Sequence, residues 1–241
     1  MGKPTARELV ERLGPHPAAS LGIDPCDEEG AGRWFIAACL LAGRAEASAA
    51  SDAYRALARD GLPSPREIAK ADPARIAREL AEAGYPKPEI AAQKLARASA
   101  ALVERWGGSL SSLAAGADGL GDLGARIAGL APGVGPATVA LFLRPLREAW
   151  TAARELPLSP AARAAALHLG LLREGEDEEG EPGALRAALA AQPDAPSLND
   201  AESALERLGR RACLRERVRS CPLGDNCPAR KQGVARRHGR E

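Results

Sequence analysis

Aromatic residues and long apolar runs are both scarce in this chain. Phe, Trp and Tyr make up 3% of its 241 residues, and few stretches show the alternation of β-branched and polar residues that is typical of strands. Alanine and leucine, which favour helices, dominate instead, so we predict an all-α protein. No stretch of about 20 apolar residues exists, and the N-terminus lacks an apolar signal-peptide core. We therefore expect no membrane partner and a cytoplasmic location.

The cysteines give no even set for a disulfide framework. There are five of them, and three lie in the basic C-terminal part of the chain. An odd number without a secretory signal favours reduced thiols in a cytoplasm.

Charge is distributed unevenly, although the net charge is only +1. Residues 173–181 contain six acidic residues and one basic residue, which indicates an exposed linker at 173–183. Residues 203–241 contain eleven Arg or Lys against four Asp or Glu. Such a tail is either a solvated end or a surface for a polyanion.

The most informative stretch is 123–144, which predicts a helix, a tight turn and a second helix. Pro132 cannot continue the first helix, and Gly133 and Gly135 tolerate the positive φ that a sharp reversal needs. Pro136 suits the first turn of the second helix. Backbone N–H groups at that helix start can bind a phosphate. An ordinary helical hairpin with Gly and Pro in its turn is the alternative.

Five segments resemble, in the same order, those of the helix-hairpin-helix DNA glycosylases, closest to the endonuclease III and adenine-mismatch glycosylase branch. LAPGVGPATVALFL resembles the hairpin signature LPGVGxKTA, and GRRACLRERVRSCPLGDNC resembles the iron–sulfur loop. RWFIAACLLAGRAE resembles the first core helix, and AGYPKPEIAAQKLARASAALVERWGG resembles the helix before the hairpin. LSPAARAAALHLGLL resembles the segment that opens with Val-Asp-Thr-His. The resemblance covers about residues 5–230.

This resemblance implies two helical lobes with a DNA-binding cleft between them, into which a target base is flipped. We expect a helical core at 1–172 that includes the hairpin, followed by the acidic linker at 173–183. C-terminal helices and a cysteine-containing loop at 184–230 would pack on the N-terminal lobe, and 231–241 would form a basic tail. The expected partner is then double-stranded DNA, and we expect the protein to associate with the nucleoid.

The family's catalytic side chains are missing from the matching positions. Members with lyase activity use a lysine two residues after the second hairpin glycine, where this chain has Ala137. Members that only hydrolyse the glycosidic bond keep an aspartate at a position that aligns with Ser159. Serine can cap the following helix but carries no negative charge. Glu155 is the nearest upstream carboxylate, so Glu155 and Ser159 are the catalytic candidates.

The metal loop is incomplete in the same way. The family spacing is Cys-x6-Cys-x2-Cys-x5-Cys, and here Cys213, Cys221 and Cys227 match the first and the last two ligands. A [4Fe–4S] cluster normally has four thiolate ligands, so we expect no cofactor. A cluster on three cysteines is the alternative, and His238 is a candidate fourth ligand for zinc.

The residues expected to contact DNA surround the hairpin. Arginine side chains can bind phosphates with two parallel hydrogen bonds. The expected contacts are Gly133, Val134, Gly135, Ala137, Thr138, Arg44, Arg126 and Arg144. Five further arginines near the cysteines, Arg210, Arg211, Arg215, Arg217 and Arg219, are weaker candidates.

Three functions remain open at this point. The first is a protein that binds damaged or distorted DNA on a glycosylase scaffold whose chemistry is lost. The second is a divergent, active monofunctional DNA glycosylase of base excision repair. The third is a helical module that has lost DNA binding and binds another protein.

Overall fold

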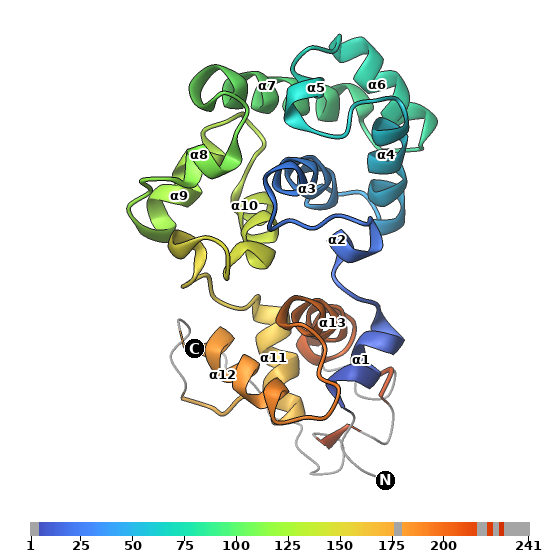
Figure 1. Ribbon diagram of the computed structural model, residues 1–241. Helices are drawn as coiled ribbons and strands as arrows, with labels where there is room; N and C mark the ends of the chain where they lie inside the picture. The colour runs from blue at the N-terminus through green and yellow to red at the C-terminus, as the bar shows by residue number, and fades with distance from the viewer. Residues whose placement is uncertain (1–4, 176–179, 216–220, 224–226, 229–241) are drawn as a thin grey trace. The chain divides into compact units, whose positions relative to one another are not determined.

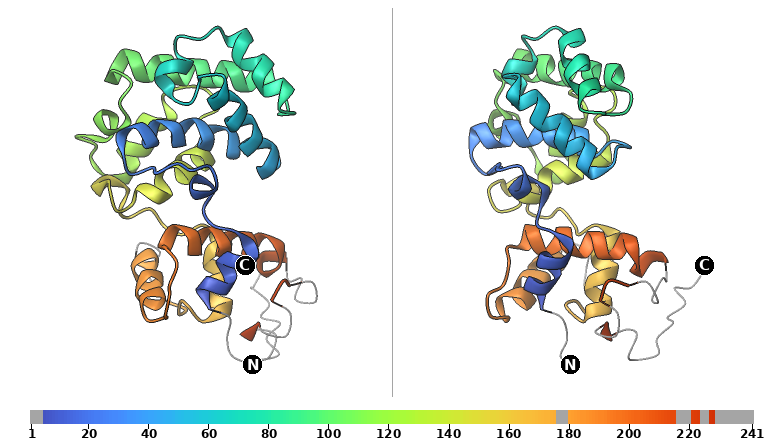
Figure 2. Two further views of the ribbon diagram at one scale, coloured as in Figure 1. Left: turned by 45° about the vertical axis from the view of Figure 1, so that its right-hand side comes forward. Right: turned by 90° about the vertical axis from the view of Figure 1, so that its right-hand side faces the viewer.

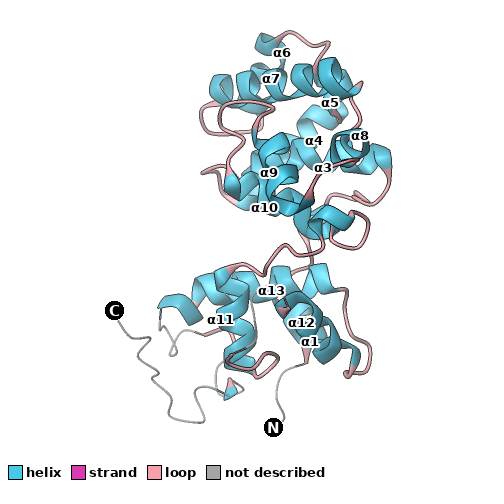
Figure 3. Ribbon diagram, turned by 90° about the vertical axis from the view of Figure 1, so that its left-hand side faces the viewer, coloured by secondary structure: helices cyan, strands magenta, loops and turns pink. Residues whose placement is uncertain are grey.

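Within the residues that the structure describes, every regular element is a helix, which confirms the predicted all-α class (Figures 1 and 3). The structure is a computed structural model that describes residues 5–175, 180–215, 221–223, 227 and 228. The elements in chain order are α1 (Ala6–Leu13), α2 (Pro17–Ser20), α3 (Glu28–Leu41), α4 (Ala47–Arg59), α5 (Pro65–Ile68), α6 (Pro73–Glu82), α7 (Pro88–Trp106), α8 (Leu110–Ala114), α9 (Gly119–Ala128), α10 (Pro136–Leu143), η1 (Arg144–Leu146), η2 (Thr151–Ala153), α11 (Pro160–Leu169), α12 (Glu181–Ala190), α13 (Leu198–Arg211) and η3 (Cys213–Arg215).

The chain divides into two compact units. The larger unit is Pro17–Leu156, and the smaller unit combines Met1–His16 with Pro157–Glu241. This division differs from the expected helical core at 1–172. The reason is that α11 and α1 both pack against α13, so the first helix and residues 157–172 belong with the C-terminal helices.

Helix α3 is the centre of the larger unit, with α4, α5, α7, α8 and α10 in contact with it (Figure 2). The Asp27 side chain caps its start by accepting a hydrogen bond from the Gly30 N–H at 2.6 Å. Trp34 is fully buried, and its indole Nε1 donates to the Phe142 carbonyl at 3.1 Å. Phe35 meets Phe142 edge to face at 5.5 Å between ring centroids. These contacts fix the hairpin helix α10 against the core.

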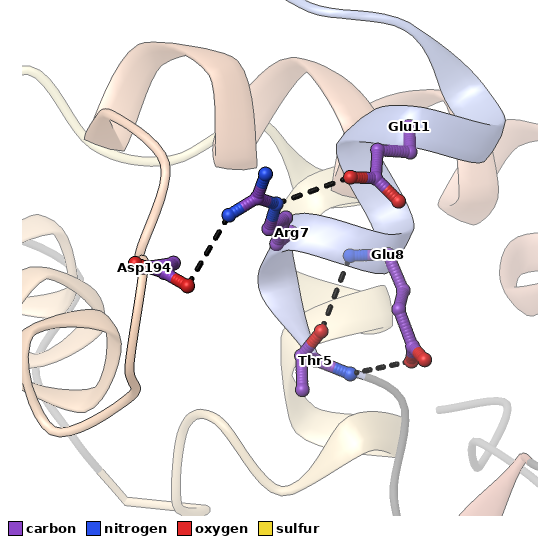
Figure 4. Close-up of polar contacts among 5 residues, drawn as sticks. All are labelled: Thr5, Arg7, Glu8, Glu11 and Asp194. Atoms are coloured by element: carbon purple, nitrogen blue, oxygen red, sulfur yellow. Dashed lines mark hydrogen bonds and ion pairs between the residues drawn. The ribbon is translucent and has the colours of Figure 1, made fainter.

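The smaller unit is held by a close contact of α13 with α11 and by capping of α1. A Cβ on Gly209 would lie 1.9 Å from the Ala161 carbonyl oxygen, so only glycine permits this approach. At the start of α1, Thr5 and Glu8 form a reciprocal capping box (Figure 4). At its end, Arg207 donates to the carbonyl oxygens of Leu13, Gly14 and Pro15.

Some boundaries differ from the sequence expectations. Helix α12 begins at Glu181, inside the predicted acidic linker, because Glu181 is buried and paired with Arg163 of α11. On α7, Leu95 and Leu102 are fully buried, whereas Ile90 is 66% exposed and Val103 39%. The predicted basic tail at 231–241, with His238, lies outside the described residues, as do Arg217 and Arg219.

Candidate nucleic-acid interface

The predicted hairpin is present as α9, a turn at 129–135, and α10. Leu123 and Ile127 are fully buried on one face of α9, and Leu130 is buried just after its end. Contacts between α9 and α10, and between α10 and α3, hold both helices in the larger unit. The side chains that fix the hairpin therefore point into the protein.

The turn exposes its backbone to solvent. Gly133 has φ +91°, a left-handed conformation that favours glycine, and it is exposed together with Pro132. Val134 is buried, and its N–H donates to the Ala131 carbonyl at 3.1 Å. Buried apolar residues thus anchor the turn, while Gly133 and Gly135 carry no side chain.

Helix α10 begins without a side-chain cap. Gly135 is its N-cap residue, Pro136 has no N–H, and the first helical bond runs from Val139 N–H to the Gly135 carbonyl at 3.0 Å. The N–H groups of Ala137 and Thr138 precede that bond, so the helix itself gives them no acceptor. Ala137 is exposed, whereas the Thr138 side chain is buried. This helix start can donate hydrogen bonds to an anion.

Two cations on α7 lie against the turn, and sequence reasoning missed both. Lys94 donates from Nζ to the Cys39 carbonyl at 2.6 Å, and its Cδ lies 3.3 Å from where a Cβ on Gly133 would be. Arg105 donates to the Gly129 carbonyl at 2.9 Å. Residues 94 and 105 are separated by about three helical turns, so they share one face of α7. The spacing of Lys94 and Arg105 was the one sign in the sequence that these two cations lie on the same face of a helix.

Replacing Lys94 with methionine is expected to lower the free energy of unfolding by about 1–3 kcal/mol, because the half-buried Cys39 carbonyl loses its charged donor while the apolar stem is kept. Urea denaturation followed by circular dichroism measures this. Arg97→Met is the matched control, because Arg97 is an exposed cation on the same helix. If the free energy of unfolding falls equally in the two variants, the hydrogen bond from Lys94 to the Cys39 carbonyl does not stabilise the fold.

The predicted DNA-contacting arginines have different surroundings. Arg44 is exposed in the connection between α3 and α4. Arg126 donates to the carbonyl oxygens of Leu113, Ala115 and Gly116 and pairs with Asp122 at 2.8 Å. Its guanidinium therefore closes the end of α8, a structural role that the sequence did not predict. Arg144 is half-buried at the end of α10.

The two catalytic candidates belong to different units. Glu155 is exposed and lies in the larger unit, near the end of that segment. Ser159 is buried in the smaller unit and is the N-cap of α11, where its Oγ accepts a hydrogen bond from the Ala162 N–H at 3.2 Å. The capping role of Ser159 that we expected is confirmed, and this bond uses one acceptor lone pair of its Oγ.

The three C-terminal cysteines gather on the apolar core of the smaller unit. Cys227 is buried there, and Cys213 and Cys221 pack against the same cluster. Burial, followed by the proximity of Cys221 and Cys227, raises the pKa of Cys213 to about 12. Among the described residues no group of three or more His, Cys, Asp or Glu is arranged to hold a metal ion. Three thiols of this kind do not fit the four-thiolate cluster that the resemblance implies.

Cys213 is expected to react with maleimide at pH 8 roughly a thousand-fold more slowly than an ordinary thiol, because a pKa near 12 instead of 9.0 leaves that much less thiolate. Labelling in native buffer followed by peptide mass spectrometry gives the rate, with free cysteine as the ordinary thiol; burial and Asp24 also raise the pKa of Cys26, so Cys26 is no substitute for it. Rapid labelling of Cys213, or iron or zinc at one equivalent per chain, would contradict protonated, metal-free thiols.

Comparisons with models of known protein families and with curated proteins find no match to this chain. A search of the described helices for one that is both long and apolar enough to cross a membrane also finds none. A function for this protein is therefore inferred from three features: the hairpin, the two cations that flank it, and the surroundings of Ser159.

Proposed function

We propose that this protein binds damaged or distorted double-stranded DNA through the hairpin turn, on a two-lobed helix-hairpin-helix glycosylase fold, without the base-releasing chemistry of that family. The observation that carries the proposal is the exposed pair Pro132 and Gly133 in the hairpin turn, followed by the uncapped start of α10. Such a surface donates backbone hydrogen bonds to phosphate and carries no sequence preference of its own.

The charges around the turn support a nucleic-acid partner. Lys94 and Arg105 contact the turn from α7 and place positive charge beside it. Arg44 is exposed five residues after Cys39, whose carbonyl Lys94 binds. Cations that neutralise phosphates release counterions from DNA, and this term dominates non-specific affinity.

The catalytic candidates favour binding over base release. Ala137 supplies no nucleophile, and Ser159 is buried at the start of α11 and carries no negative charge. A missing carboxylate near a developing positive charge is worth several kcal/mol in a partly dry site, and about 1.4 kcal/mol corresponds to tenfold in rate. Glu155 is exposed, so it lacks the buried surroundings that usually prepare a catalytic acid.

A panel of duplexes tests the proposal directly. Matched duplexes that are intact, mismatched, nicked or carry an abasic-site analogue are titrated by fluorescence anisotropy, and base release is measured on the same samples. We expect tighter binding to the distorted duplexes and no released base. Base release that Glu155→Gln abolishes would instead establish the divergent glycosylase. Absence of binding to every duplex would favour the protein-interaction module.

A further inference from the structure

A second feature of the larger unit, distinct from the hairpin, is a pocket of about 410 Å³ between α3, α4 and the loop that precedes α3. Pockets that hold small ligands usually measure about 300–1,000 Å³. Its charged lining comes from Arg33 of α3 and from Arg55 and Arg59 in the last part of α4. Three arginines from two helices therefore line a space of ligand size.

Two of these arginines have hydrogen-bonding capacity to spare. Arg33 pairs with Glu29 through Nη2, and its Nη1 makes no hydrogen bond or ion pair with any described residue. Arg59 is exposed and makes no hydrogen bond or ion pair with any described residue. Guanidinium N–H groups that are not used inside the protein can donate to an anion in the pocket.

The third arginine is already held in place. Arg55 donates to Asp52 at 2.9 Å and to the Ser20 carbonyl at 3.3 Å. The bond to Ser20 holds the end of α2 against α4, beside the pocket. Arg55 contributes its positive charge to the pocket, whereas Arg33 and Arg59 have donors left for an anion.

The rest of the lining is apolar. Leu21, Ile23, Ala58 and Pro63 surround the space together with Tyr54. The Tyr54 hydroxyl lies 3.5 Å from the Pro63 carbonyl, and burial raises the pKa of Tyr54 to about 12, so its ring stays neutral. A purely inorganic anion would leave this apolar surface unused, whereas a flat organic body would cover it.

The pocket lies at one end of the α3–α4 pair, and Arg44, a proposed DNA contact, lies at the other end. Arg33 is in the first half of α3, and Arg59 is the last residue of α4. Arg44, by contrast, lies in the connection where α3 ends and α4 begins. Since α3 and α4 pack along each other, a ligand in the pocket does not compete for the proposed DNA contacts.

We propose that this pocket binds a phosphomonoester carried on a flat apolar body, of the size of a nucleoside monophosphate. Guanidinium groups bind phosphate oxygens in bidentate pairs, and a dianionic phosphate matches two arginines with spare donors better than a single carboxylate does. The apolar walls then contact the flat body. The site does not depend on DNA binding by the hairpin.

Isothermal titration calorimetry of the full chain at low ionic strength tests this with AMP, adenosine and inorganic phosphate as the probes. We expect saturable binding of AMP, with adenosine and inorganic phosphate each at least about 10-fold weaker, because each lacks one half of the ligand. Arg59→Ala should weaken AMP binding at least about 10-fold, since charged hydrogen bonds are lost. Ala58→Trp should weaken it as well by filling the pocket.

Arg97→Ala is the matched control, because it removes an exposed arginine of the same unit that does not line the pocket. It should leave AMP affinity unchanged. Absence of saturable AMP binding, an equal loss in Arg97→Ala and Arg59→Ala, or inorganic phosphate binding as tightly as AMP would each overturn the proposal. Because Arg59 is exposed, loss of the fold does not explain its effect, and circular dichroism of each variant verifies this.

Discussion

Replacing Ala137 with aspartate is expected to weaken binding to duplex DNA about 10- to 100-fold while raising the stability of the protein. Ala137 is exposed at the second position of α10, beside the turn that we propose binds phosphate. A carboxylate there repels a phosphate nearby by a few kcal/mol. The same carboxylate interacts favourably with the helix dipole, worth about 0.3–1 kcal/mol. Anisotropy titrations and urea denaturation measure the two effects separately.

The chain offers a close match as control. Ala74 is also an exposed alanine at the second position of a helix, after Pro73 at the start of α6. Ala74→Asp changes the net charge equally, so it should reduce DNA affinity much less. If both variants lose the same affinity, net charge alone accounts for the effect and the hairpin is not the contact.

Replacing Gly209 with alanine is expected to lower the free energy of unfolding by about 3 kcal/mol, the largest stability effect anticipated here. The new Cβ would lie 1.9 Å from the carbonyl oxygen and 2.5 Å from the carbonyl carbon of Ala161. Both are backbone atoms, so no rotamer change relieves the overlap, and α11 must move away from α13. Urea denaturation of the full chain measures the loss.

Gly183→Ala is the control within the same unit. Gly183 lies inside α12, and an added Cβ there meets no atom within 4 Å. That substitution should stabilise the protein by about 0.5–1 kcal/mol, because alanine favours a helix interior. A Gly209→Ala variant as stable as the natural chain would mean that α11 and α13 do not approach as closely as described.

The elements of the fold could be predicted because their signals are local. Thr5, Asp72 and Ser159 each precede a helix that begins where a capping side chain would place it. The hairpin was visible for the same reason, since its Pro and Gly residues lie next to each other in the chain.

The surroundings of the hairpin could not be read in this way. Lys94 donates to the Cys39 carbonyl, 55 positions away in the chain, and the residues next to Lys94 in the sequence do not predict this contact. Arg126 was expected to contact DNA, and only the structure shows that it also donates to three carbonyl oxygens. Glu181 appeared to belong to a solvated linker until its pairing with Arg163 explained its burial. Each depends on tertiary contacts, which override local composition.

The chemistry of the site was predicted in part. The positions of Ala137 and Ser159 were identified by a resemblance to a family, and the structure adds what their side chains do. For the three cysteines the sequence supplied the spacing, and the fold supplies the burial that raises the pKa of Cys213. No sequence motif marks the pocket lined by Arg33 and Arg59, because its lining residues come from four short segments of the chain.

The dependence of duplex affinity on salt concentration tests the central claim most directly. If the hairpin turn, Lys94, Arg105 and Arg44 contact the phosphate chain, the logarithm of the association constant should fall linearly with the logarithm of salt. The slope for B-DNA is about −0.9 per phosphate neutralised, so a few contacts give a slope of roughly −2 to −4. Ala137→Asp should lower the whole line. A slope near zero, or no binding at low salt, would contradict the account.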